Sequence, residues 1–220
     1  SFFRKFPYGK YIKAIIILLA LWSYAGITGM SPSVMRASTM FTFIVLGTTL
    51  KRNTNIYNTL ASSALFLLLF NPFLLMEVGF QLSYLAVIGI VYLQPKINAW
   101  FYSKYWIVEK VWEITSVSIA AQIATFPLGL LYFHQFPNLF LISNLLVIPA
   151  AAGILYLGFS LFIFSFWKPT LLYFGFLLDT LISSLNQIVV WIEKVPYSVL
   201  SGIDISTIES LLIYLIIAGL

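Results

Sequence analysis

Arg36 is the residue whose setting points most directly to binding chemistry. It lies in the stretch 28–40 between two long apolar runs. Gly29 lets the chain turn, and Ser31 and Pro32 are the residue types that favour the N-cap and the first position of a helix. Arg36 then falls in the second turn of that helix, which continues as apolar sequence to residue 50. An arginine that enters an apolar helix is costly unless it meets water, phosphate or a partner.

Two explanations for Arg36 remain open at this point. The helix N-terminus already favours an anion, and a guanidinium adds a full charge that can hold a phosphate by two hydrogen bonds. Alternatively, Arg36 forms a structural pair with an acid such as Glu77 or Asp179. We predict the first, with Arg36 at the outer mouth of a path for an anionic substrate.

A stripe of neutral polar residues follows one side of a predicted helix over residues 111–131. Such a stripe either lines water or forms hydrogen bonds to neighbouring helices, and its length favours lining. The opposite side carries small apolar residues. The stripe consists of Thr115, Ser118, Gln122, Thr125 and Gly129, spaced by three and four residues.

Polar residues also lie in two other predicted helices. Asp179, in the helix over 171–191, would sit inside the bilayer, where an acid is a functional candidate by default. We favour a hydrogen-bonded acid that packs the bundle, because no intramembrane base lies nearby in the sequence. In the helix over 78–94, Gln81 and Tyr84 share a face that can touch solvent or substrate.

Prolines are expected to shape the helices. Asn71 and Pro72 predict the end of a helix, while Pro127 and Pro149 predict interruptions within two others. Broken backbone at membrane depth is tolerated only against protein or a water-filled cavity. We therefore assign Pro127, Asn144 and Pro149 to the shape of the path, with a simple kink as the alternative for each proline.

Composition places the chain in the membrane. Of its 220 residues 61% are hydrophobic and only 9% are charged, against about 25% charged in soluble domains. There is no cysteine, one histidine and seven acidic residues, so neither a disulfide nor a multi-ligand metal centre is expected. No nucleophile–base pair, carboxylate pair or phosphate-binding glycine loop is present. We expect no catalytic activity and no cofactor.

The expected fold is all-α, a polytopic transmembrane bundle of about seven to eight helices, several of them broken at proline or glycine. We expect residues 1–220 to form a single membrane domain that is a fragment of a longer chain. A turn is predicted over 134–138, and an aromatic-rich interfacial connection is predicted over 96–110. The predicted helices cover residues 14–27, 32–50, 56–70, 78–94, 111–131, 139–166, 171–191 and 208 onward.

The basic residues predict the orientation. If each segment crosses once, ten of the twelve fall on one side, which the positive-inside rule makes cytoplasmic. Arg36 and Lys194 fall on or near the outer side. The ten are Arg4, Lys5, Lys10, Lys13, Lys51, Arg52, Lys96, Lys104, Lys110 and Lys168.

Four blocks, in this order and spacing, resemble the membrane domain of the ComEC competence family. They lie at residues 28–37, 71–83, 121–127 and 144–149, with the sequences TGMSPSVMRA, NP…VGFQLS, AQIATFP and NLLVIP. The resemblance implies a multi-pass channel in the bacterial cytoplasmic (inner) membrane that passes single-stranded DNA into the cytoplasm during natural transformation.

The resemblance also implies partners beyond the lipid bilayer. These are single-stranded DNA, other proteins of the competence machinery, OB-like and metallo-β-lactamase-like domains of the same chain, and further copies in a homo-oligomer. Such DNA needs a polar path with positive charge and surfaces on which bases stack. A secondary transporter for a small solute, with a midplane site at broken helices, remains an alternative. So does a structural bundle that scaffolds an enzyme domain elsewhere in the chain.

Overall fold

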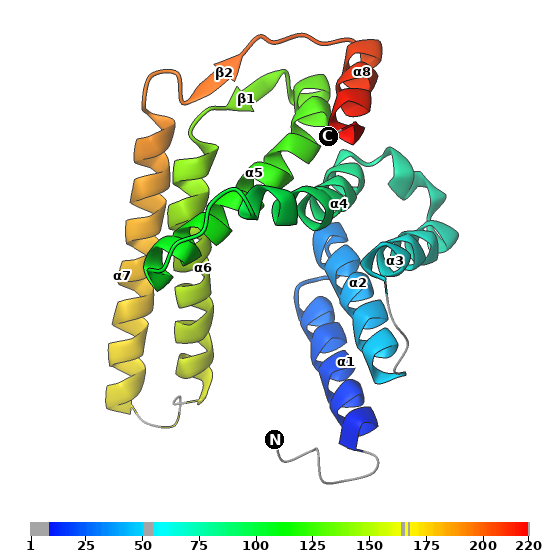
Figure 1. The fold of residues 1–220 in the computed structure, drawn as a ribbon. Helices are drawn as coiled ribbons and strands as arrows, with labels where there is room; N and C mark the ends of the chain where they lie inside the picture. Colours follow the sequence, from blue (N-terminus) through cyan, green and yellow to red (C-terminus); the bar gives the residue numbers. More distant parts are fainter. Residues whose placement is uncertain (1–8, 51–54, 164–165, 167, 220) are drawn as a thin grey trace. The chain divides into compact units, whose positions relative to one another are not determined.

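The computed structural model describes residues 9–50, 55–163, 166 and 168–219. Within these residues the chain forms eight α-helices, one short 3-10 helix and two short strands (Figure 1). The predicted all-α fold of seven to eight helices is therefore confirmed. The flanking basic residues Arg4, Lys5, Lys51 and Arg52 lie outside the described residues.

Five helices are long and apolar enough to cross a membrane, so this is a multi-pass membrane protein. They are α1 (Gly9–Ile27), α4 (Val78–Asn98), α5 (Trp106–Phe133), α6 (Phe140–Ile163) and α7 (Lys168–Glu193). The other three helices are shorter: α2 (Pro32–Thr49), α3 (Ile56–Phe70) and α8 (Thr207–Ala218).

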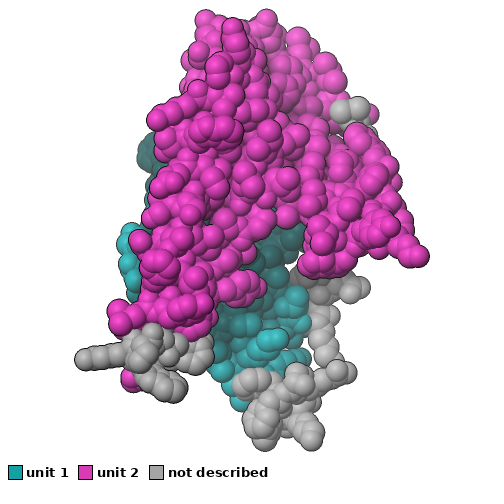
Figure 2. All heavy atoms as spheres, turned by 90° about the vertical axis from the view of Figure 1, so that its left-hand side faces the viewer, with its two compact units in different colours: residues 1–91 teal, residues 92–220 magenta. Residues whose placement is uncertain are grey.

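The chain divides into two compact units, residues 1–91 and 92–220, which Figure 2 colours separately. The boundary falls within α4.

In the first unit α1 and α2 run side by side and α3 packs against α2 (Figure 1). Two hydrogen bonds tie α1 to α2, from Lys10 Nζ to the Thr49 carbonyl (3.3 Å) and from Trp22 Nε1 to Thr42 Oγ1 (3.2 Å). The buried core lies between α3 and α4. It consists of Leu60, Leu67, Phe80 and Tyr84, with Met40 of α2 packed against it.

Asn71 and Pro72 end α3 as predicted. Asn71 is the C-cap of α3, and its side chain accepts a hydrogen bond from the backbone N–H of Phe73 (3.1 Å). Pro72 occupies the first turn of the 3-10 helix η2 (Pro72–Met76), where its missing N–H is no loss.

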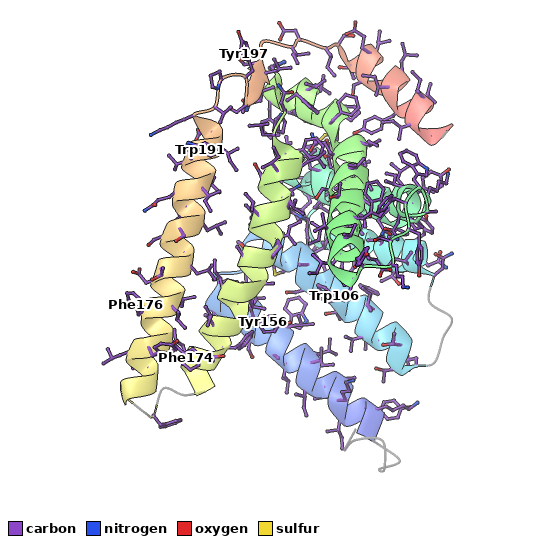
Figure 3. All side chains as sticks on the ribbon, turned by 60° about the vertical axis from the view of Figure 1, so that its left-hand side comes forward. Trp106, Tyr156, Phe174, Phe176, Trp191 and Tyr197 are labelled. Atoms are coloured by element: carbon purple, nitrogen blue, oxygen red, sulfur yellow. The ribbon has the colours of Figure 1, made fainter. Side chains whose placement is uncertain are left out.

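In the second unit α6 and α7 form an antiparallel pair (Figures 1 and 3). The strands β1 (Gln135–Pro137) and β2 (Val199–Ser201), which follow α5 and α7, pair antiparallel with Phe136 opposite Leu200. The predicted turn over 134–138 and the loop after α7 thus contain a small sheet. The helix α8 packs against α5, and the Tyr214 hydroxyl donates to the Ala124 carbonyl (3.0 Å).

Three proline predictions need correction. The helix predicted over 78–94 stops before Pro95, yet α4 continues through this proline to Asn98. Pro127 and Pro149 were expected to interrupt their helices, yet both lie within the continuous helices α5 and α6. Neighbouring helices and local adjustments satisfy the backbone groups that proline leaves unpaired, so membrane helices tolerate proline in their interior.

Candidate functional site

The turn before α2 has the geometry that its residues predict. Gly29 and Met30 both adopt left-handed backbone conformations, with φ of 72° and 52°. Ser31 occupies the N-cap position and Pro32 the first turn of α2, but the Ser31 side chain forms no capping hydrogen bond. The free N–H groups at this helix start therefore keep their capacity to bind an anion.

The guanidinium of Arg36 lies in the first unit against the N-terminal part of α4. The residue is only 9% exposed, and its Nε has no hydrogen-bond partner among the described residues. A Cβ built on Gly79 would lie 3.4 Å from Nη2 and 3.8 Å from Nη1 of Arg36. These distances are those of ordinary van der Waals contact, so the guanidinium packs closely against α4 at Gly79.

The structural pair considered for Arg36 is not formed within the first unit. Glu77 is the only acidic residue of the sequence up to residue 91, and the described residues include no ion pair between it and Arg36. Glu77 itself is exposed. Within this unit Arg36 is thus a nearly buried cation without a counter-charge. An anion that binds to the guanidinium would supply the missing negative charge.

Other buried polar groups lie on the helices around Arg36. Thr39, one turn further along α2, is 1% exposed, and its Oγ1 has no partner among the described residues. The Tyr84 hydroxyl forms a hydrogen bond with Ser63 Oγ of α3 (3.1 Å) and lies within electrostatic range of Arg36. Arg36 thus lies within electrostatic range of a buried hydroxyl pair of α3 and α4, and Thr39 adds a further buried polar group on α2.

Tyr84 was predicted to share with Gln81 a face that can touch solvent or substrate, and within the first unit the Tyr84 side chain is buried. Tyr84 is 8% exposed and packs on Phe80, with ring centroids 4.6 Å apart. Gln81 is half-buried, and its Nε2 donates to the Leu75 carbonyl (2.9 Å). Its amide thus fixes η2 to the start of α4.

The polar stripe of α5 belongs to the second unit. Thr115 and Thr125 are partly exposed, and each hydroxyl donates to its own helix, to the carbonyls of Val111 and Ala121 (both 2.8 Å). These two hydroxyls therefore do not join α5 to another helix. Gln122 is also partly exposed, and none of the hydrogen bonds between described residues involves its side chain.

The buried side of α5 is its alanine side, which contains Ala120 and Ala124. Ala120 packs on Leu93 and Ile97 at the end of α4. Ser118 departs from the rest of the stripe because it is 4% exposed, and its Oγ has no partner among the described residues. The predicted lining role of Ser118 thus does not fit its place in this unit.

Asp179 lies on an exposed face of α7 with Ser183, Asn186 and Gln187. It was expected to pack the bundle, but in the described part of the second unit it is exposed and forms no ion pair. Aromatic side chains of the α6–α7 pair are also exposed, namely Phe176 and Trp191 on α7 and Tyr156 on α6 (Figure 3). Asn144 is half-buried and Pro149 exposed on α6.

One side-chain contact was missed because it joins segments that are distant in the sequence. His134 ends α5 in a left-handed conformation (φ 54°), and its Nδ1 lies 3.1 Å from Asp204 Oδ1. The His134 carbonyl accepts hydrogen bonds from the N–H groups of Gly202 and Ile203. Among the described residues no three histidine or acidic side chains come close enough to hold a metal ion.

The chain is similar to known proteins over most or all of its length. The family model described as Competence protein matches residues 1–220. Among curated proteins the chain is similar to ComE operon protein 3 of Bacillus subtilis (strain 168), with 31% identity over 191 residues. The match takes in 83% of this chain but 23% of that protein, so the chain spans about a quarter of its relative's length. No solved structure matches.

Proposed function

The chain belongs to the competence protein family, and from this premise we propose that it forms an inner-membrane channel for single-stranded DNA. The DNA enters the bacterial cytoplasm through it during natural transformation. The chain's role is transport rather than catalysis. Its partners are the DNA, the other competence proteins and the OB-like and metallo-β-lactamase-like domains of a full-length parent, with self-association into a homo-oligomer.

The observation that carries the proposal is the uncompensated charge of Arg36. Arg36 lies in the second turn of α2 and is only 9% exposed, and a buried charge is costly unless a partner compensates it. Within the first unit no carboxylate offsets that cost. A DNA phosphate supplies the missing negative charge only while DNA passes, which suits a transport path better than a permanent ion pair.

Two features of the second unit support a path for DNA. The partly exposed Thr115, Gln122 and Thr125 give α5 a neutral polar face over which a charged backbone can move without being trapped. The solute-transporter alternative rests on helices interrupted at the midplane. It has less support, because α5 and α6 run continuously through Pro127 and Pro149.

The test is the Arg36→Gln substitution in a full-length parent. We expect normal protein abundance and DNA internalisation reduced about tenfold or more, because hydrogen bonds to charged groups contribute about 1.5–3 kcal/mol. Arg36→Lys keeps the charge and should restore part of the uptake. Loss of folded protein with both substitutions, or unchanged uptake with Arg36→Gln, would contradict the proposal.

A further inference from the structure

The hydroxyl of Thr39 behaves differently from those of the other threonines of α2. Thr42, Thr48 and Thr49 each donate to the backbone carbonyl four residues earlier, at 2.7, 2.9 and 2.6 Å. The same bond, to the carbonyl of Met35, would satisfy Thr39. Its Oγ1 nevertheless has no partner among the described residues, although the residue is only 1% exposed. A buried hydroxyl without a partner costs free energy, so this group is kept free of its own helix at a cost to the fold.

Arg36 lies on the same side of α2 as Thr39, because residues three apart are neighbours on a helix surface. Its Nε also has no partner among the described residues. Nε can only donate a hydrogen bond, and the Thr39 hydroxyl can donate one as well. A water molecule can accept both bonds, but it would leave the guanidinium charge without compensation in a unit whose only acidic residue forms no ion pair with it. An oxyanion accepts both bonds and compensates the charge.

The two unpaired atoms are buried in the structure. The guanidinium of Arg36 packs on α4 at Gly79, and the residue as a whole is 9% exposed. An oxyanion therefore reaches Nε and the Thr39 hydroxyl only when the Arg36 side chain moves away from α4. Contact and release then alternate, which suits a chain of phosphates that passes one group at a time.

We propose that Thr39 is a second phosphate ligand, and that its hydroxyl binds the same DNA phosphate as the Arg36 guanidinium. A phosphodiester has two free oxygens, so it can accept from Nε and from the hydroxyl at once. The guanidinium supplies the charge, and the hydroxyl fixes the orientation of the phosphate. Contacts to phosphate do not depend on the base, which transport of any sequence requires. The inference rests on the proposed function.

The test is Thr39→Val in purified full-length protein in lipid nanodiscs. Valine keeps the shape but lacks the hydroxyl, and because that hydroxyl has no partner, the melting temperature should stay unchanged or rise. The affinity for an oligothymidine with phosphodiester linkages should fall about tenfold, as the loss of a hydrogen bond to a charged group indicates. The weaker binding of an uncharged methylphosphonate strand should not change. Thr39→Ser should bind like the wild type. Thr48→Val removes an exposed hydroxyl that bonds only to its own helix, so this matched control should change neither affinity.

The remaining outcomes overturn the inference. A lower melting temperature of Thr39→Val shows that the hydroxyl supports the fold. Unchanged DNA affinity of Thr39→Val, with reduced affinity of Arg36→Gln, removes Thr39 from the site and leaves the channel intact. Loss of copurified anionic lipid from Thr39→Val without a change in DNA affinity assigns the site to a lipid headgroup. Unchanged affinity of both variants, with normal uptake by Arg36→Gln, overturns the site and the proposed function together.

Discussion

Gly79 and Arg36 fit each other across the contact of α2 with α4. A Cβ at position 79 would lie 3.4 Å from Nη2, in ordinary van der Waals contact, so a side chain that extends beyond Cβ toward Arg36 would compete with the guanidinium for space. The packing of the guanidinium on α4 therefore limits the size of the side chain that position 79 can carry.

The first prediction follows from this fit. Gly79→Ala places a Cβ in ordinary contact and should keep DNA uptake, since alanine also favours the helix. Gly79→Leu should displace the guanidinium and lower uptake about as far as Arg36→Gln, with protein abundance maintained. Gly26→Leu is the control, because nothing lies within 4 Å of a Cβ at Gly26. If Gly79→Leu and Arg36→Gln lower uptake additively, the two residues do not act as a unit.

The second prediction concerns the hydrogen bond between Tyr84 and Ser63. Tyr84→Phe should lower the free energy of unfolding by about 1 kcal/mol, because it leaves the buried Ser63 hydroxyl with one partner fewer. Thermal unfolding in detergent measures the change. Tyr57→Phe, at an exposed position of α3, should have no effect. If Tyr84→Phe instead leaves stability intact and abolishes DNA uptake, Tyr84 contacts the substrate as the sequence predicted.

The third prediction addresses the two sides of α5. The chain contains no cysteine, so any reaction with a thiol reagent comes from the single cysteine that is introduced. Cysteines at Thr115, Gln122 and Thr125 should react with small soluble thiol reagents several times faster than cysteines at Ala120 and Ala124. A cysteine at Ser118 should be protected because that residue is buried. Equal rates at all six positions would show that the stripe does not face water.

The fourth prediction tests the orientation. The connection over 96–110 should be cytoplasmic and the loop after α7 external. In intact cells an impermeant thiol reagent should label a cysteine at Tyr197, which is 81% exposed, and spare one at Ser103. Permeabilised cells should label both. The reverse pattern would invert the whole arrangement and place Arg36 on the cytoplasmic side.

Local chemistry accounts for the parts of the fold that the sequence predicted. The turn at Gly29, the start of α2 at Pro32 and the end of α3 at Asn71 depend only on backbone preferences of a few neighbouring residues. The prolines within α4, α5 and α6 were misjudged because their cost depends on the surrounding helices. The strands escaped notice because three residues each are too few to show a period of two.

The candidate site was less predictable, because it depends on how the helices pack against one another. The charge of Arg36 in an apolar segment was enough to identify this residue from the sequence. The sequence did not predict that the guanidinium packs against α4. Whether Tyr84 faces solvent or the core depends on where α3 packs, and nothing in the spacing of α4 fixes that.

The pairing of β1 with β2 also constrains the order in which the second unit is assembled. The two strands are separated by the whole of α6 and α7, and the Asn138 amide reaches the Tyr197 carbonyl across 59 residues of sequence. Closing a loop of this length gains nothing until both ends are on the same side of the bilayer. The strands can therefore meet only after the α6–α7 hairpin has been inserted.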